Sequence, residues 1–177
     1  MRLTRRIVLV ALAGTLAPPF AGTAQPAPAE GELELTSLHT HESVRFLFRE
    51  GAALDDATAA RVAHVLRDHR SSEERDIDPA LFAQLVRLAA AAAVPARYEV
   101  ISAYRAPATN AKLRESSQGV SSRSLHMEGR AIDVRLRDVD ALRLATLARA
   151  LGAGGVGYYP GDRFVHIDTG RPRTWDG

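Results

Sequence analysis

The residues best suited to chemistry are histidines and aspartates near the C-terminal end of the 177-residue chain. Ile132, Val134 and Leu136 alternate along a predicted strand, and the side chains of a strand point alternately to opposite faces. Asp133 therefore lies on the face opposite these apolar residues. His126 stands just before the strand, where a turn can bring its imidazole toward the Asp133 carboxylate.

A second predicted strand, residues 163–168, alternates in the same way and leaves His166 and Asp168 together on its polar face. If the two strands are neighbours, His166 can join His126 and Asp133 around one cation. Two imidazoles and one carboxylate, with a fourth position for water, form the ligand set of a catalytic zinc site. Zinc acidifies its water and polarises a carbonyl, so hydrolysis there needs no protein nucleophile.

Each part of this pattern has a plainer interpretation when taken alone. A single histidine on a strand is more often structural than a metal ligand, and Asp133 could pair with Arg130 or Arg135 instead. The chain contains no cysteine, which excludes thiol nucleophiles, Cys-ligated zinc and a disulfide framework. The metal hypothesis therefore depends on the joint pattern of the three residues.

The other four histidines are predicted to take no part in this site. His39 and His41 have a spacing that could bind metal on a strand, but they stand in a polar turn. His64 and His69 are five residues apart on a predicted helix and point in different directions. The run Arg67-Asp68-His69-Arg70 could bind an anion, although a solvated helix end is the simpler interpretation.

The N-terminal segment is typical of an export signal. Arg2, Arg5 and Arg6 precede an apolar run, which small residues and a Pro/Ala-rich stretch follow. We expect residues 1–24 to be a signal peptide cleaved after Ala24, because the run is shorter than the roughly 20 residues of a membrane span. A twin-arginine signal and a Sec signal are the two alternatives, and with either one the mature protein is extracytoplasmic.

Composition and length indicate one globular domain, with 46% hydrophobic and 25% charged residues. We expect a linker over 25–32 and a single domain over 33–177. Removing the three signal arginines from the 23 basic residues leaves 20 against 21 acidic ones, so the formal net charge of +2 does not support nucleic-acid binding. We also expect a monomer with no stable membrane insertion after signal cleavage.

The remaining patterns predict an α+β domain in which helices pack against a small antiparallel sheet that carries the metal site. Predicted strands cover 33–38, 44–48, 98–102, 130–136 and 163–168, the first two as a hairpin. Predicted helices begin at Asp55 or Asp56, cover 80–94 and 109–114, and begin again at Asp138. In the last helix Leu142 is expected to face the core, and residues 152–157 are expected to break the pattern.

The motif Ser124-x-His126-x-x-Gly129-x-Ala131-x-Asp133 is similar, position for position, to the first metal motif of the zinc D,D-peptidase superfamily. That superfamily includes D-alanyl-D-alanine carboxypeptidases and dipeptidases and shares the hedgehog fold. Segments 101–105, 154–160 and 164–170 resemble its murein endopeptidase K-like branch. The resemblance covers about residues 33–175 and is specific in its second half.

This resemblance implies a hedgehog/D,D-peptidase-like fold with one zinc ion per chain on His126, Asp133 and His166. It implies an activated water that attacks peptide cross-links of peptidoglycan, the expected partner. Arg105 matches the Ser-x-Tyr-Arg element of the superfamily, whose arginine stabilises the oxyanion or holds a substrate carboxylate. A surface salt bridge is the alternative role for Arg105.

One position departs from the superfamily pattern. Many members carry a general-base glutamate three residues before the last histidine ligand, where this chain has Arg163. Asp168 is our candidate for the base, with Asp162 and Glu128 as alternatives. Asp168 could instead orient a ligand imidazole.

The leading functional hypothesis is a periplasmic murein endopeptidase. A D,D- or L,D-carboxypeptidase that acts on stem peptides is the alternative with the same metal. A non-catalytic cell-wall-binding domain that keeps the fold is the alternative from another class.

Overall fold

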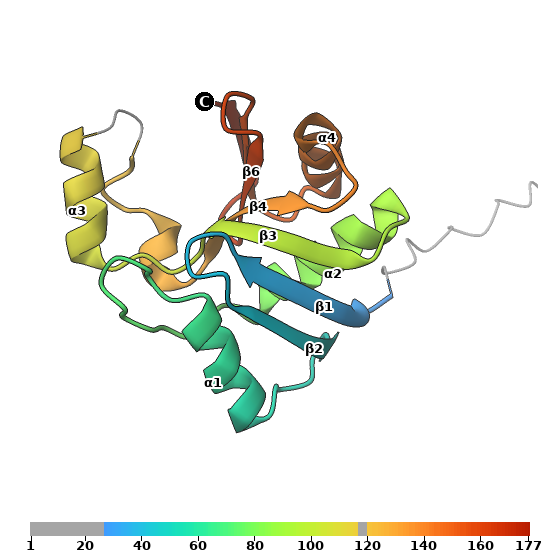
Figure 1. Cartoon of the computed structure of the whole chain (residues 1–177). Helices are drawn as coiled ribbons and strands as arrows, with labels where there is room; N and C mark the ends of the chain where they lie inside the picture. Colours follow the sequence, from blue (N-terminus) through green and yellow to red (C-terminus); the bar gives the residue numbers. More distant parts are fainter. Residues whose placement is uncertain (1–26, 117–119) are drawn as a thin grey trace, which may run out of the picture.

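The computed structural model describes residues 27–116 and 120–177 (Figure 1), so the predicted signal peptide 1–24 lies outside the described residues. The strands are β1 Glu30–Ser37, β2 Ser43–Arg49, β3 Ala96–Ser102, β4 Ala131–Leu136, β5 Gly155–Tyr159, β6 Phe164–Asp168 and β7 Arg173–Asp176. The helices are α1 Asp56–Val65, α2 Pro79–Ala92, α3 Pro107–Ser116, the short 3-10 helix η1 Leu125–Glu128, and α4 Ala141–Leu151. The α+β class is thus confirmed.

A single seven-stranded sheet with the order β2-β1-β3-β4-β6-β5-β7 organises the domain. The predicted hairpin is confirmed as the antiparallel pair β1–β2. The sheet is larger than expected and is mixed, because β1 pairs with β3 and β5 with β7 in parallel. β1 begins at Glu30, inside the expected linker, and its first residues pair with the end of β2.

Strands β5 and β7 were not predicted from the sequence. The glycines of residues 152–157 suggested a break, yet Gly155 and Gly157 lie in β5. A Cβ at Gly157 would stand 2.5 Å from the Trp175 ring, so the glycine allows this ring of β7 to lie against β5. The glycine inside this strand is therefore explained by a tertiary contact, which periodicity does not reveal.

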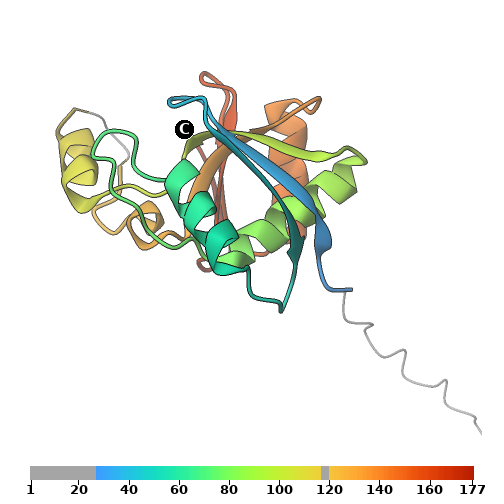
Figure 2. The ribbon, with the colours of Figure 1, turned by 60° about the horizontal axis from the view of Figure 1, so that its bottom comes forward.

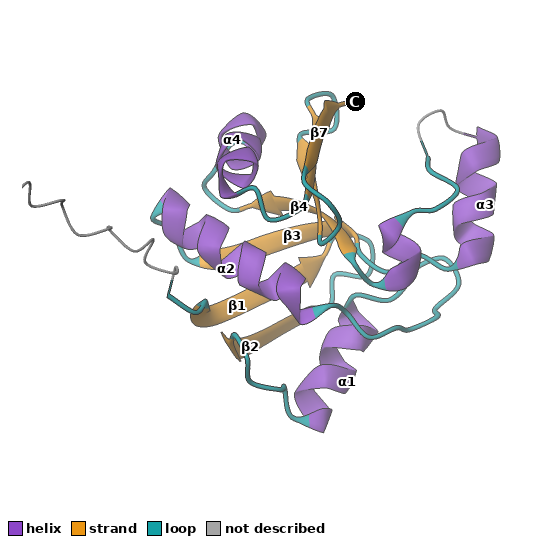
Figure 3. Ribbon diagram, turned by 180° about the vertical axis from the view of Figure 1, so that it is seen from behind, coloured by secondary structure: helices purple, strands orange, loops and turns teal. Residues whose placement is uncertain are grey.

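Helices α2 and α4 cover one face of the sheet, and α1 packs beside β1 and β2 (Figure 3). Asp78 caps α2 by accepting from the Ala80 amide, and Pro79 occupies the first turn, where its missing N–H is not needed. Leu81 and Leu85 are fully buried against the sheet. Figure 2 shows α3 at the side of the molecule, away from the helices that cover the sheet.

The start of α4 differs from the prediction. Asp140 is the N-cap and accepts from the Arg143 amide, whereas Asp138 adopts a left-handed conformation (φ 63°) in the preceding turn. The buried stripe of α4 consists of Leu144, Ala145 and Ala148, while Leu142 is 55% exposed. Among the described residues, no helix combines the length and apolarity needed to cross a bilayer.

Candidate metal centre

Three elements bring the predicted metal-binding side chains together at the middle of the sheet. β4 and β6 are antiparallel neighbours, and their register places Asp133 directly opposite His166. Helix η1 supplies His126 and ends at Gly129, which has a left-handed conformation (φ 68°). A Cβ at Gly129 would collide with the Asp76 carbonyl, so this close turn requires glycine.

The donor atoms of the three side chains form a tight cluster. The Asp133 Oδ1 lies 2.8 Å from His166 Nδ1 and 3.3 Å from His126 Nε2, and the two ring nitrogens are 3.2 Å apart. All three residues are buried enough to limit competition by water. The structure thus brings together the three residues that the sequence placed around one cation.

Hydrogen bonds on the outer side of each imidazole fix which nitrogen faces the cluster. His126 Nδ1 lies 2.7 Å from the Ala103 carbonyl, which can only accept, so Nδ1 carries the proton. His166 Nε2 lies 3.1 Å from Asp168 Oδ2, which also accepts. In its neutral form each ring therefore turns a lone pair toward the cluster, as metal-binding histidines do.

These lone pairs fit a divalent cation. Two ring nitrogens and a carboxylate oxygen within 3.3 Å of one another repel unless a proton or a cation lies among them. Burial disfavours ionised Asp133, but the two imidazoles outweigh burial and hold the pKa of this carboxyl far below its usual range. Burial also lowers the pKa of His166, but the hydrogen bonds with Asp133 and Asp168 raise it to about 9.

Asp168 lies behind His166 and is fully buried. Its Oδ1 accepts from the amides of Gly155 and Gly170 at 2.9 and 2.8 Å, and its Oδ2 accepts from Arg173 Nη2 at 2.6 Å. Burial opposes the negative charge, but these donors and His166 lower the pKa of Asp168. A carboxylate with occupied oxygens and a low pKa is a poor proton acceptor, so this placement argues against the expected role as general base.

The two other candidates for the base also stand apart from the cluster. The Glu128 carboxylate accepts from Arg130 Nη1 at 3.1 Å, beside the open pocket at 75–79. The Asp162 side chain is exposed and, among the described residues, makes no hydrogen bond or ion pair with the three clustered side chains. Arg163, at the position of the superfamily's glutamate, is exposed with a left-handed backbone (φ 55°).

Arg105 borders the cluster on the side of β3. Its side chain is only 13% exposed, and Nη2 lies 3.8 Å from Asp133 Oδ2 and 3.4 Å from Ser102 Oγ. Nη1 donates to Asn110 at 3.3 Å, while Nε is buried without a partner among the described residues. This burial does not fit the alternative of a surface salt bridge.

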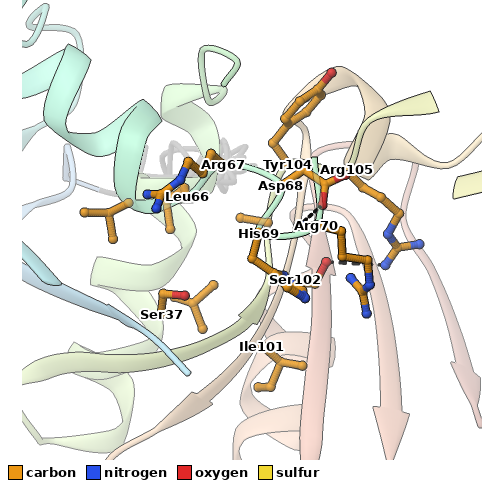
Figure 4. A pocket seen from close by; sticks show the side chains of 13 residues that line it. Ser37, Leu66, Arg67, Asp68, His69, Arg70, Ile101, Ser102, Tyr104 and Arg105 are labelled. Carbon is orange, nitrogen blue, oxygen red and sulfur yellow. Dashed lines mark hydrogen bonds between the residues drawn. The ribbon is translucent and has the colours of Figure 1, made fainter. Parts of the chain in front are cut away.

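One residue near the cluster was missed from the sequence, and a second was named there only as part of a run that could bind an anion. The Trp175 ring lies 5.1 Å from the His166 ring and donates through Nε1 to the Tyr159 hydroxyl. Its only sequence signal is a lone tryptophan in a polar C-terminal stretch. Arg70 lines a pocket together with Ser102 and Arg105 (Figure 4), although the sequence favoured a solvated helix end there.

Residues 25–175 match the family model described as peptidoglycan L,D-endopeptidase MepK. The chain is 38% identical over 166 residues to the peptidoglycan L,D-endopeptidase MepK of Escherichia coli. These 166 residues cover 94% of this chain and 91% of that protein. It is 35% identical over 146 residues to a probable peptidoglycan L,D-endopeptidase MepK of Haemophilus influenzae, with 82% and 78% covered. No solved structure matches the chain.

Proposed function

Because this chain belongs to the peptidoglycan L,D-endopeptidase MepK family, we propose that it hydrolyses peptide cross-links of peptidoglycan at one bound zinc ion. The relatives' names specify a bond between an L-configured and a D-configured centre, and the proposal takes over this specificity. The observation that carries it is the cluster of His126, Asp133 and His166, with both imidazoles turned inward by outer hydrogen bonds.

The donor set supports zinc as the metal. Two imidazoles and one carboxylate suit this borderline ion, and catalytic zinc sites keep three protein ligands. His126 Nε2, Asp133 Oδ1 and His166 Nδ1 would hold it. When bound, the ion supplies a Lewis acid that acidifies water and polarises the scissile carbonyl.

The chain's own groups then position the reacting atoms. In the hydrolysis a bond forms between the water oxygen and the carbonyl carbon, the C–N bond breaks, and a proton from water reaches the leaving amine. Arg105 stabilises the negative charge that develops on the carbonyl oxygen, because its guanidinium is buried beside Asp133. Asp168 keeps the His166 ring oriented and takes no proton from the water.

The proposed setting is the periplasm, where peptidoglycan lies, with residues 1–24 as the cleaved export signal and the mature chain as a monomer. Retention of the full cluster together with Arg105 argues against a merely binding domain. The names of the relatives favour an endopeptidase over a carboxypeptidase.

Digestion of cross-linked muropeptide dimers, combined with metal analysis, tests the proposal. We expect one zinc ion per chain, release of monomers, and loss of cleavage when a chelator removes the metal. His166→Ala should abolish cleavage, whereas His64→Ala, which changes an exposed histidine of α1, should not. Cleavage by His166→Ala at the parent rate would exclude the metal role, and loss of one terminal residue without monomer release would indicate a carboxypeptidase.

A further inference from the structure

The loop after α1 is fastened to the segment that carries Arg105. Asp68 is buried, and its carboxylate accepts from the Ala106 amide and from the Arg70 amide, both at 2.9 Å. The Tyr104 amide donates to the Leu66 carbonyl at 3.0 Å. These bonds place the backbone of Arg70 beside Arg105, although the two residues are far apart in the sequence.

In this loop, three residues of the run 67–70 contact a partner side chain or backbone group, and the fourth forms no ion pair among the described residues. Arg67 Nη1 donates to Glu42 Oε2 at 2.6 Å, and Asp68 is occupied as described. The His69 ring stacks on His39 with centroids 3.7 Å apart. Arg70 is exposed, and among the described residues no carboxylate forms an ion pair with its guanidinium. It therefore remains available to an outside anion.

The free guanidinium faces a second one. Figure 4 shows the side chains of Arg70 and Arg105 both pointing toward Ser102, and the three residues line one pocket. Two neighbouring guanidinium groups repel each other unless an anion shares their donors.

We infer that Arg70, together with Arg105, binds a free carboxylate of the substrate next to the scissile bond, and that Arg70 thereby determines specificity. The inference rests on the proposed function. A bond between an L-centre and a D-centre leaves the D-centre on the amine side, and an unamidated D-centre carries a carboxylate two bonds from the scissile nitrogen. Two guanidinium groups offer this carboxylate several charge-assisted hydrogen bonds.

A pair of muropeptide dimers tests the inference, one with this carboxylate free and one with it amidated. We expect the parent enzyme to cleave the free acid with a kcat/KM about 10–100-fold higher, the range for a charge-assisted contact. Arg70→Gln should remove this preference mainly by raising KM for the free acid, because the contact is present before the reaction as well as during it. The amidated dimer should be cleaved almost as before.

Arg61→Gln is the matched control, because Arg61 is an exposed arginine of α1 and should leave both substrates unaffected. Arg70→Lys keeps the charge but not the planar fork, so we expect a partial preference. Calorimetry with the amine-side product, as free acid and as amide, gives a readout that does not depend on turnover. Here too the preference of the parent should vanish in Arg70→Gln.

The outcomes separate the two proposals. If Arg70→Gln folds, as shown by its thermal unfolding, and keeps the parent's preference, the role of Arg70 is wrong while the peptidase function stands. A parent enzyme that cleaves both dimers equally well overturns the carboxylate subsite in the same way. If the zinc-loaded parent cleaves neither dimer, the proposed function itself fails.

Discussion

The candidate metal centre and the loop after α1 that carries Arg70 each contain a buried aspartate, but the two aspartates hold different groups in place. Asp168 joins backbone and side chains: Oδ1 accepts from the amides of Gly155 and Gly170, and Oδ2 faces the His166 ring and the Arg173 guanidinium. Asp68 makes no contact with a candidate metal ligand among the described residues; it accepts from the amides of Arg70 and Ala106 and from the Thr109 side chain. The first arrangement fixes a ring, while the second fixes a stretch of backbone and leaves the side chain of Arg70 free.

This difference matches the demands on the two regions. A metal ligand must present its lone pair within a few tenths of an ångström of the required position, so its ring needs a direct partner. A side chain that binds a variable part of the substrate must lie near it but can adopt several conformations. Binding residues of this kind commonly lie on loops that a rigid scaffold holds in position. Arg105 lies between the two regions and is expected to serve both.

Among residues outside the three candidate metal ligands, replacement of Arg105 should therefore have the largest effect. We expect Arg105→Ala to lower kcat about 100–1,000-fold, the cost of removing a donor that stabilises an oxyanion. In contrast with Arg70→Gln, the loss should appear with both dimers, and it should be larger with the free acid because Arg105 also contacts its carboxylate. Steady-state kinetics on both dimers measure this, with Arg61→Ala as control. If Arg105→Ala only raises KM for the free-acid dimer and leaves kcat unchanged, Arg105 binds the substrate carboxylate and does not stabilise the oxyanion.

Asp168→Asn tests whether the buried carboxylate orients His166 or acts as a base. Loss of the partner of a ligating histidine should weaken metal affinity about 10–100-fold. Because the reaction itself does not need Asp168, we expect activity to recover when zinc is added in excess. Metal titration and kinetics at several zinc concentrations measure both effects.

The control for this variant is Asp162→Asn, which removes the carboxylate of the alternative base and should behave as the parent. If Asp168→Asn binds zinc as tightly as the parent but stays inactive at saturating metal, Asp168 takes part in proton transfer. If Asp162→Asn loses activity instead, the base lies in the loop between β5 and β6.

How far the sequence predicts this site depends on whether the signal is local. Alternation along β6 places His166 and Asp168 on one face, because the period of a strand is a property of the backbone. The direct pairing of Asp133 with His166 depends on strand register, which alternation alone does not specify. The family resemblance was needed to bring the two together.

Features that depend on tertiary contacts could not be predicted from the sequence. Strand β5 contains two glycines, which predict a turn, but Gly157 leaves room for the Trp175 ring and β5 pairs with both β6 and β7. The four polar residues at 67–70 look alike in sequence but have different surroundings. Arg67 forms an ion pair, the buried Asp68 accepts from backbone amides, the His69 ring stacks on another ring, and the Arg70 guanidinium has no ion-pair partner among the described residues. No local pattern distinguishes Arg70 from Arg67.

The smallest predicted effect concerns stability and belongs to Asp68. Burial opposes the charge of Asp68, but hydrogen bonds from Thr109 and from the amides of Arg70 and Ala106 lower its pKa below the ordinary value of 3.8. The native protein therefore binds fewer protons than the unfolded chain as the pH falls through this value. The stabilisation is present above the unfolded pKa and is lost as the pH falls through the folded pKa.

We therefore expect Asp68→Asn to lower the free energy of unfolding at pH 7 by about 1–3 kcal/mol, the cost of weakening a buried hydrogen-bonded group. The difference from the parent should shrink as the pH drops below about 4, because only the parent then loses a charge. Urea unfolding from pH 7 to 3 measures it, with exposed Asp56→Asn as the control. Zinc affinity should not change, but KM for the free-carboxylate dimer should rise as the Arg70 backbone loosens. A stability difference that stays constant with pH would mean that the Asp68 charge does not hold the loop.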